Sequence, residues 1–182
     1  MKVSMLRSLA IGATAAVGLA LVASSANAQA QTSGTRFGLE AAYANHYNLG
    51  VGAFVKFHLT EFNDRPLTGR VSFDYYFPGD YGYTGANYSQ KFFQVAGDAL
   101  YDITASGDTK PYIGAGVVYS HYSVDCSGCY SSGNGGIGLD IMGGLNFMAN
   151  SKLMPFVEAK LGLGGSTGGY GNQFVIKGGI HF

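Results

Sequence analysis

One pattern repeats eight times along most of this sequence: apolar side chains occupy every second position. Between residues 51 and 59, for example, Val51 and Val55 share one face of an extended chain, whereas Lys56 and His58 share the other. Successive residues of a β-strand face opposite sides of the sheet, so this spacing predicts strands with one apolar and one polar face. The segments reach about 9–11 residues, the length at which a tilted strand crosses a bilayer.

The distribution of charge between the two faces decides between a soluble and a membrane barrel. A soluble barrel points apolar side chains inward, whereas a membrane barrel turns its apolar face to lipid and keeps its interior polar. Here the apolar face is continuous and the charges lie on the opposite face. The sequence therefore predicts an all-β fold: an eight-stranded antiparallel transmembrane β-barrel with an up-and-down meander, spanning residues 36–182.

The interior of such a barrel is small. Eight strands leave a space that is just wide enough for side chains, and a buried charge without a partner is costly. We therefore expect the inward charges to pair and to close the interior, with a narrow small-solute channel as the alternative. His58 and His181 share the inward parity. The predicted lumen charge network consists of Glu40, Lys56, Arg70, Asp74, Asp98, Asp102, Asp140, Glu158, Lys160 and Lys177.

The breaks between the segments carry turn residues and tend to alternate in length. Longer breaks, rich in Gly, Tyr and Ser, are expected on the outward side of the membrane. The predicted outward breaks are 45–49 (a short exception), 79–89, 123–135 and 165–172, and the opposite turns are 60–68, 104–109 and 150–152. Tyrosines at the loop tips are candidates either for adaptable binding of a surface ligand or host factor or for an aromatic belt. These are Tyr81, Tyr83, Tyr88, Tyr130 and Tyr170.

The first 28 residues predict a secretory signal peptide. The positive residues Lys2 and Arg7 precede an uncharged, largely apolar run, and small residues allow cleavage after Ala28 or Ala30. Removal of this segment leaves nine basic and eleven acidic residues, and so changes the formal net charge from 0 to −2.

Composition excludes several functional classes. Charged residues make up only 12% of the chain and form no basic cluster, which argues against a nucleic-acid partner. The 29 glycines and 13 tyrosines do not favour a helical bundle. The sequence contains no phosphate-binding loop and no cluster of metal ligands, so we expect neither a cofactor nor a bound metal.

The C-terminal segment carries the most specific family likeness. Residues 173–182 place Phe174, Ile176, Ile180 and Phe182 at alternate positions. The chain resembles the small OmpA/OmpX-type barrels and the broad outer-membrane β-barrel domain family of Gram-negative bacteria. The resemblance implies a place in the outer membrane, contact with its lipid and lipopolysaccharide, and recognition of these four residues by the barrel-assembly machinery. It does not extend to the peptidoglycan-binding domain of OmpA, because the sequence stops at Phe182.

Aromatic residues near the strand ends predict an interfacial girdle. The chain has no Trp, so the girdle must be built from Tyr and Phe. We expect it to include Tyr43, Phe77, Tyr119 and Tyr122.

Cys126 and Cys129 fall in the third outward break. In an oxidising compartment two cysteines most simply form a disulfide, which here would shape the loop tip. Free thiols are one alternative. A redox-active pair is another, although such a pair needs a helix N-terminus to lower the pKa of its thiol, and no helix is predicted here. A metal site recruiting His121 or Asp125 is a further alternative, although closed sites usually need four ligands.

His121 and Ser123 form the one arrangement with a catalytic pattern, since a histidine beside a serine is what nucleophilic catalysis needs. The resemblance to lipid A deacylases and outer-membrane phospholipases makes a lipid-modifying hydrolase the alternative function, with Asn134 as a candidate third group. A two-residue motif is weak, so we expect no enzymatic activity. The function expected is that of a monomeric outer-membrane barrel that acts in envelope integrity or in surface interaction through its extracellular loops.

Overall fold

The chain divides into two units, Met1–Thr35 and Arg36–Phe182, and the second contains all the strands of the described residues. The computed structural model describes residues 34–78, 88–104, 107–126, 132–149, 151–167 and 170–182. The predicted signal peptide lies outside these ranges. No helix in the described residues is both long enough and apolar enough to cross a membrane.

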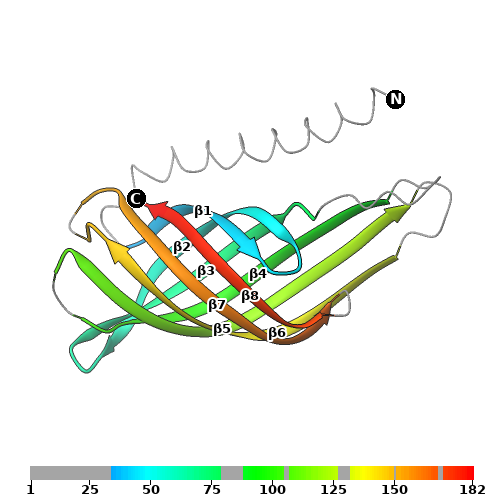
Figure 1. Ribbon diagram of the computed structural model, residues 1–182. Coiled ribbons are helices and arrows are strands. Elements are labelled where there is room, and N and C mark those ends of the chain that lie inside the picture. Colours follow the sequence, from blue (N-terminus) through cyan, green and yellow to red (C-terminus); the bar gives the residue numbers. More distant parts are fainter. Residues whose placement is uncertain (1–33, 79–87, 105–106, 127–131, 150, 168–169) are drawn as a thin grey trace. The chain divides into compact units, whose positions relative to one another are not determined.

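Eight antiparallel strands form a closed barrel in the unit Arg36–Phe182 (Figure 1). They are β1 (Arg36–Ala44), β2 (Asn48–Phe62), β3 (Arg65–Tyr76), β4 (Tyr88–Asp102), β5 (Thr109–Cys126), β6 (Ser132–Phe147), β7 (Met154–Thr167) and β8 (Tyr170–His181). Each strand pairs with the next one in the chain, and β1 pairs with β8 to close the barrel. The predicted all-β meander of eight strands is therefore confirmed.

The two faces of the barrel wall differ as the alternation predicts. Buried residues alternate with exposed residues along β1, for example. The buried positions face the interior, whereas the outward positions carry apolar side chains that remain exposed, a feature that marks a lipid or protein contact surface. This outward band includes Leu39, Val51, Val71, Ile113, Val117, Leu139, Ile141, Val157 and Ile176.

We call the end of the barrel that carries Arg36 and Phe182 the terminal end, and the opposite end the loop end. At the terminal end, β2 and β3 are joined by the two-residue turn Asn63-Asp64, whose φ angles are 51° and 59°. Left-handed residues at both positions match the twist of a tight hairpin, and Asn and Asp tolerate that conformation. The predicted break at 60–68 was too long, because strand pairing continues almost to the turn.

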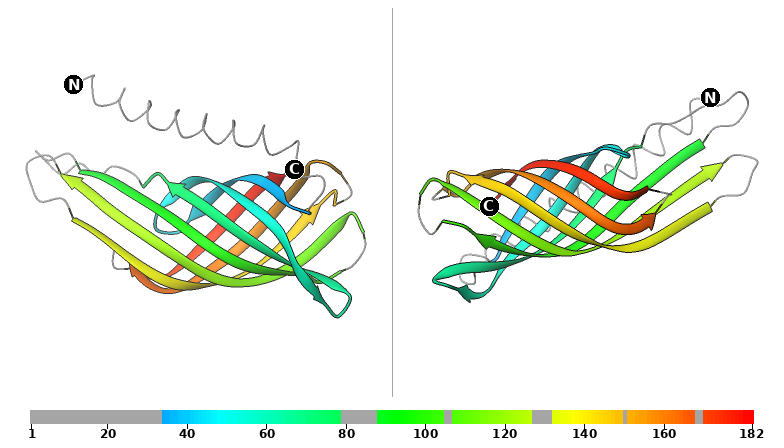
Figure 2. Two further views of the ribbon diagram at one scale, coloured as in Figure 1. Left: turned by 180° about the vertical axis from the view of Figure 1, so that it is seen from behind. Right: turned by 60° about the horizontal axis from the view of Figure 1, so that its bottom comes forward.

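At the loop end, strands β4, β5 and β6 continue beyond their neighbours (Figures 1 and 2). The last pair of β3 with β4 is Tyr76 with Phe92, and the last pair of β6 with β7 is Gly138 with Gly164. We call the remaining three-stranded part, residues 88–91, 121–126 and 132–137, the outer extension. The predicted loop 123–135 was therefore wrong over most of its length, because both of its ends form paired strands.

Candidate functional site

The centre of the lumen is crossed by a salt-bridged arginine. The guanidinium of Arg70 on β3 donates to the Asp98 carboxylate on β4, with an N–O distance of 2.8 Å. It also donates to both carboxylate oxygens of Glu158 on β7, at 2.7 and 3.0 Å. The Tyr112 hydroxyl donates to the same Glu158 carboxylate at 2.8 Å. All four side chains are buried. Because β3 and β7 are four strands apart in the closed barrel, the bonds between Arg70 and Glu158 connect opposite walls.

Two lysines complete this central network. The Lys177 ammonium lies 2.8 Å from a carboxylate oxygen of Glu40 and 2.6 Å from one of Asp74. The Lys160 ammonium lies 2.8 Å from a carboxylate oxygen of Asp140. All five side chains are buried. Buried charges need partners of this kind, because desolvation of an unpaired ion costs several kcal/mol.

The structure thus brings eight of the ten residues of the predicted lumen charge network into ion pairs: Glu40, Arg70, Asp74, Asp98, Asp140, Glu158, Lys160 and Lys177. The other two, Lys56 and Asp102, make no ion pair with any described residue. His58 has inward parity but is exposed, because it lies beside a register shift near the terminal end of β2.

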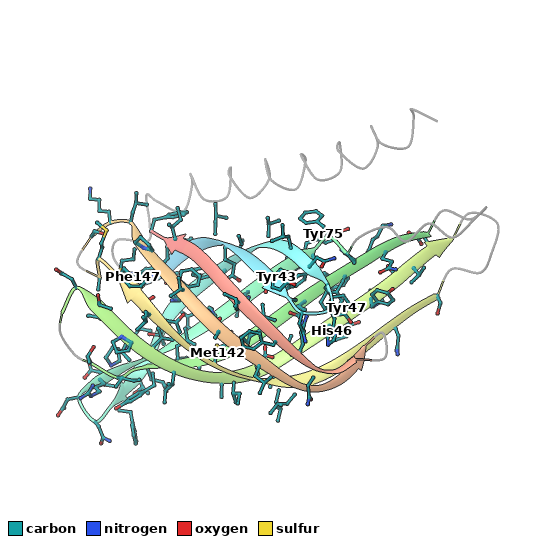
Figure 3. The ribbon with its side chains drawn as sticks, viewed as in Figure 1. Tyr43, His46, Tyr47, Tyr75, Met142 and Phe147 are labelled. Atoms are coloured by element: carbon teal, nitrogen blue, oxygen red, sulfur yellow. The ribbon has the colours of Figure 1, made fainter. Side chains whose placement is uncertain are left out.

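An aromatic cluster fills the lumen at the loop end. Tyr47, from the tight β1–β2 turn, stacks on Phe92 with ring centroids 3.5 Å apart and planes at 9°. Tyr76 lies 5.3 Å from Phe92, and Tyr122 lies 6.0 Å from Tyr47. Tyr47, Tyr76 and Phe92 are at most 3% exposed. Figure 3 shows Tyr47 at this end of the barrel.

Tyr122 was predicted in the lipid-facing girdle, and this prediction was wrong. Its position has the inward parity of Ser120, and its ring packs against the cluster. Tyr43, Phe77 and Tyr119 are exposed on the outward side, as the girdle requires. The difference arises because the outer extension continues the β-pairing, so parity still determines which way Tyr122 points.

A cage of three aromatic rings surrounds Lys56 at the terminal end. Its ammonium lies 5.4 Å from the Phe54 centroid, 5.3 Å from that of Tyr112 and 5.5 Å from that of Phe156. Each distance is within the range of a cation–π contact. These rings occupy inward positions that the alternation predicted to be mainly small or polar.

Glycine on a neighbouring strand makes room for each ring of the cage. A Cβ atom at Gly38 would overlap the Phe54 ring, and one at Gly144 would lie 2.5 Å from atoms of Tyr112. A Cβ at Gly179 would lie 2.7 Å from the Phe156 ring and would also collide with the β1 backbone. At the terminal end, the rings of the cage therefore fit because the neighbouring strand positions carry no side chain.

His121 and Ser123 lie together on the outward face of the outer extension. The His121 ring packs against Phe93 with centroids 5.2 Å apart, and no hydrogen bond joins it to Ser123 within the described residues. Asn134 pairs directly with Tyr122, so it has the inward parity and is on the opposite face. The predicted third group is therefore not placed to orient His121, and this part of the catalytic hypothesis was wrong.

Only some of the predicted cysteines and tyrosines of the loop end lie in the part of the chain that the structure describes. Cys126 ends β5, whereas Cys129 lies outside the described residues together with Tyr81, Tyr83 and Tyr130. Tyr88 and Tyr170 begin β4 and β8, so they lie at strand ends rather than at loop tips. No group of three or more metal-ligating side chains occurs among the residues that are described.

One ion pair lies above the apolar band, on the outside of the outer extension. The ammonium of Lys91 is 2.7 Å from the Asp125 carboxylate, and both side chains are about half exposed. The hydrogen bond to Asp125, together with its charge, raises the pKa of Lys91. The pair marks where the outward face changes from apolar to polar.

Comparison with known proteins shows the same architecture. No family model and no curated protein matches the sequence, but solved structures do. Neisserial surface protein A is 20% identical, with a TM-score of 0.60 over 82% of this chain and 96% of that chain. A major outer membrane protein from Thermus thermophilus is 12% identical, with a TM-score of 0.62 over 81% and 98%. Ail, the attachment invasion locus protein of Yersinia pestis, in complex with the heparin analogue sucrose octasulfate, is 11% identical, with a TM-score of 0.51 over 81% and 96%.

The fold is that of the small outer-membrane β-barrels. In this barrel, three residues of the predicted C-terminal assembly signal, Phe174, Ile176 and Ile180, point outward and are exposed. The fourth, Phe182, exchanges two backbone hydrogen bonds with Phe37, of 3.1 and 2.8 Å, where the barrel closes. The C-terminal segment therefore presents an apolar face to the outside and completes the wall with its backbone.

Proposed function

We propose that this protein is a non-enzymatic, monomeric barrel of the outer membrane whose lumen does not conduct solutes. The observation that carries the proposal is the double obstruction of the lumen. Ion pairs cross its centre, and the stacked Tyr47–Phe92 pair fills its loop end. A water-filled pore would need a continuous polar path, which larger barrels provide with many more strands.

The outward face supports the membrane location. Ile137, Leu139 and Val51 are more than half exposed, and similar side chains surround the barrel. In water such a band would drive aggregation, whereas in lipid it is the expected surface of a membrane barrel. Its partners under this proposal are outer-membrane lipid, lipopolysaccharide and the barrel-assembly machinery.

The loop end is the part through which we propose that the barrel acts, either in envelope integrity or in binding at the cell surface. The outer extension leaves residues 132–137 of β6 without a partner strand on the β7 side in the described residues. An unpaired strand edge offers backbone donors and acceptors to another chain. Ail, which has this fold, was solved in complex with a heparin analogue, so a barrel of this kind can bind a ligand.

Conductance in planar bilayers tests the closed lumen. The purified protein should give no stable open-channel current, and stable, selective conductance would contradict the proposal. Heat-modifiable mobility of an outer-membrane fraction tests the location. Recovery of the folded protein from the soluble periplasm would overturn the assignment to the membrane.

Shortening the hairpin of the outer extension tests the role of the loop end. A chain that lacks residues 124–132, with Ser123 rejoined to its strand partner Gly133 by Asn-Gly, should keep its heat-modifiable mobility but lose envelope protection or surface binding. Unchanged cell-surface phenotypes would contradict the interaction role. Ester hydrolysis that disappears in Ser123→Ala would instead support the hydrolase.

A further inference from the structure

Three cations stand side by side on the lumen wall near the terminal end. Arg36 on β1 is the direct partner of Lys56 on β2, and Lys56 is the direct partner of Arg70 on β3. Direct partners in antiparallel strands point to the same face, with Cβ atoms about 4.5–5.5 Å apart, and like charges in this arrangement repel each other. Anions beside such a row would relieve this repulsion.

Only one of these three cations has its anions within the described residues. Arg70 is held by Asp98 and Glu158. Arg36 donates to the Met154 sulfur at 3.1 Å, and a thioether is a weak acceptor without charge. Lys56 is held by the rings of its aromatic cage, which attract a cation but do not cancel its charge.

A buried histidine beside this row also lacks a partner. His181 is 3% exposed, and both of its ring nitrogens are without a hydrogen bond. Its ring lies 6.1 Å from Phe54 and 5.9 Å from Phe156, two rings of the cage, and Lys56 and Arg36 are within electrostatic range. Buried polar groups are nearly always bonded to protein, water or a ligand, so an unpaired imidazole indicates a missing partner.

The carboxylates at the terminal end either already bond Arg70 or lie too far from Arg36 and Lys56 for an ion pair. Both oxygens of Glu158 bond Arg70, and one also accepts from Tyr112. Asp102 is half-buried and interacts with Lys110 as well as with Lys56 and Arg36, without a contact short enough for an ion pair. Among the described residues, neither Arg36 nor Lys56 therefore has a carboxylate within ion-pair distance.

We propose that Arg36, Lys56 and His181 form a binding site for a small oxyanion such as phosphate. The guanidinium of Arg36 offers two parallel donors, the ammonium of Lys56 offers a compact charge, and the imidazole offers an N–H. Lys56 and His181 are buried inside the barrel, and Arg36 lies exposed at its terminal end. The acyl chains of a lipid cannot follow a headgroup into the closed wall. The ligand is therefore a free ion or the phosphate end of a soluble molecule that enters from the terminal end.

The test is a titration of the purified protein in octyl glucoside, a detergent without phosphate, with sodium phosphate at constant ionic strength. The readout is the imidazole NMR signal of His181, which is identified by its loss in His181→Asn. The signal should shift saturably with phosphate and should not shift with chloride. A shift that grows without saturation, or that chloride reproduces, would overturn the site.

Variants connect the shift to the proposed residues. Lys56→Met keeps an apolar stem in the cage and should weaken phosphate binding by about tenfold or more, the loss of one charge-assisted hydrogen bond. Lys91→Met removes an exposed cation at the loop end and should leave the affinity unchanged. Arg36→Gln, at an exposed position, gives a second measurement that does not disturb the cage. Wild-type affinity in both Lys56→Met and Arg36→Gln would overturn the proposal, and it would do so without affecting the conductance test.

Discussion

The centre of the lumen and its loop end are both filled, but by opposite kinds of interaction. In the centre, Arg70, Lys177 and Lys160 are held by buried carboxylates. At the loop end, Tyr47 and Phe92 stack, with almost no exposed area. Removal of one partner leaves a buried charge in the first region and a cavity in the second. The two regions should therefore respond differently to the same kind of truncation.

The largest effect is expected for Arg70→Met. This change leaves Asp98 and Glu158 buried without their cation, which typically costs about 3–5 kcal/mol. The measurement is urea-dependent unfolding of the protein in lipid vesicles, followed by heat-modifiable mobility. A loss of less than about 1 kcal/mol would show that water already solvates the central carboxylates.

A smaller loss is expected for Tyr47→Ala at the loop end. Truncation of a buried aromatic ring costs about 3–5 kcal/mol in a rigid core, and a turn can partly collapse around the gap, so we expect about 2–4 kcal/mol. His46→Ala, in the same turn and exposed, is the matched control. If the two variants unfold at the same urea concentration, the stacked ring does not contribute to stability.

A double replacement sharpens the comparison, because it converts one charged pair into an apolar one. Lys160→Met alone leaves Asp140 unpaired, whereas Lys160→Met with Asp140→Val removes both charges. The double variant should unfold within about 1 kcal/mol of the wild type, since apolar replacement of a whole buried pair is often neutral. A double variant as unstable as the single one would mean that Asp140 has another essential partner.

The smallest effect is expected at the exposed pair of the outer extension. Lys91→Met should change the free energy of unfolding by less than about 1 kcal/mol, because water and salt screen surface ion pairs. The urea titration of Lys91→Met should give the same free energy of unfolding at low and at high salt. A larger loss would show that the outer extension is coupled to the barrel below it.

The strand faces could be predicted because parity is a local property. The spacing of Val51, Val55 and Lys56 is visible in the sequence, and the structure places these residues on the expected faces. The ends of strands could not be predicted in the same way. Residues 132–136 are mostly glycine and serine, a composition typical of loops. They form a strand because β6 pairs with β5 along this whole stretch.

The aromatic parts of the lumen were missed for a different reason. Phe54 fits its inward position only because Gly38 is its partner on β1, and this relation depends on strand register. Tyr47 is buried only because its turn folds over the loop end of the barrel. Neither fact follows from composition or periodicity, although a large aromatic at an inward position next to glycine-rich strands is a usable signal.

The reciprocal hydrogen bonds between Phe37 and Phe182 have a consequence for biosynthesis. A chain interrupted before β8 would expose the free edge of β1, whose amide and carbonyl groups cannot be solvated by hydrocarbon. Such a product has no low-energy state in the bilayer and should remain available to periplasmic proteases. The last strand thus separates finished molecules from unfinished ones, because only a closed wall leaves no unpaired strand edge in the bilayer.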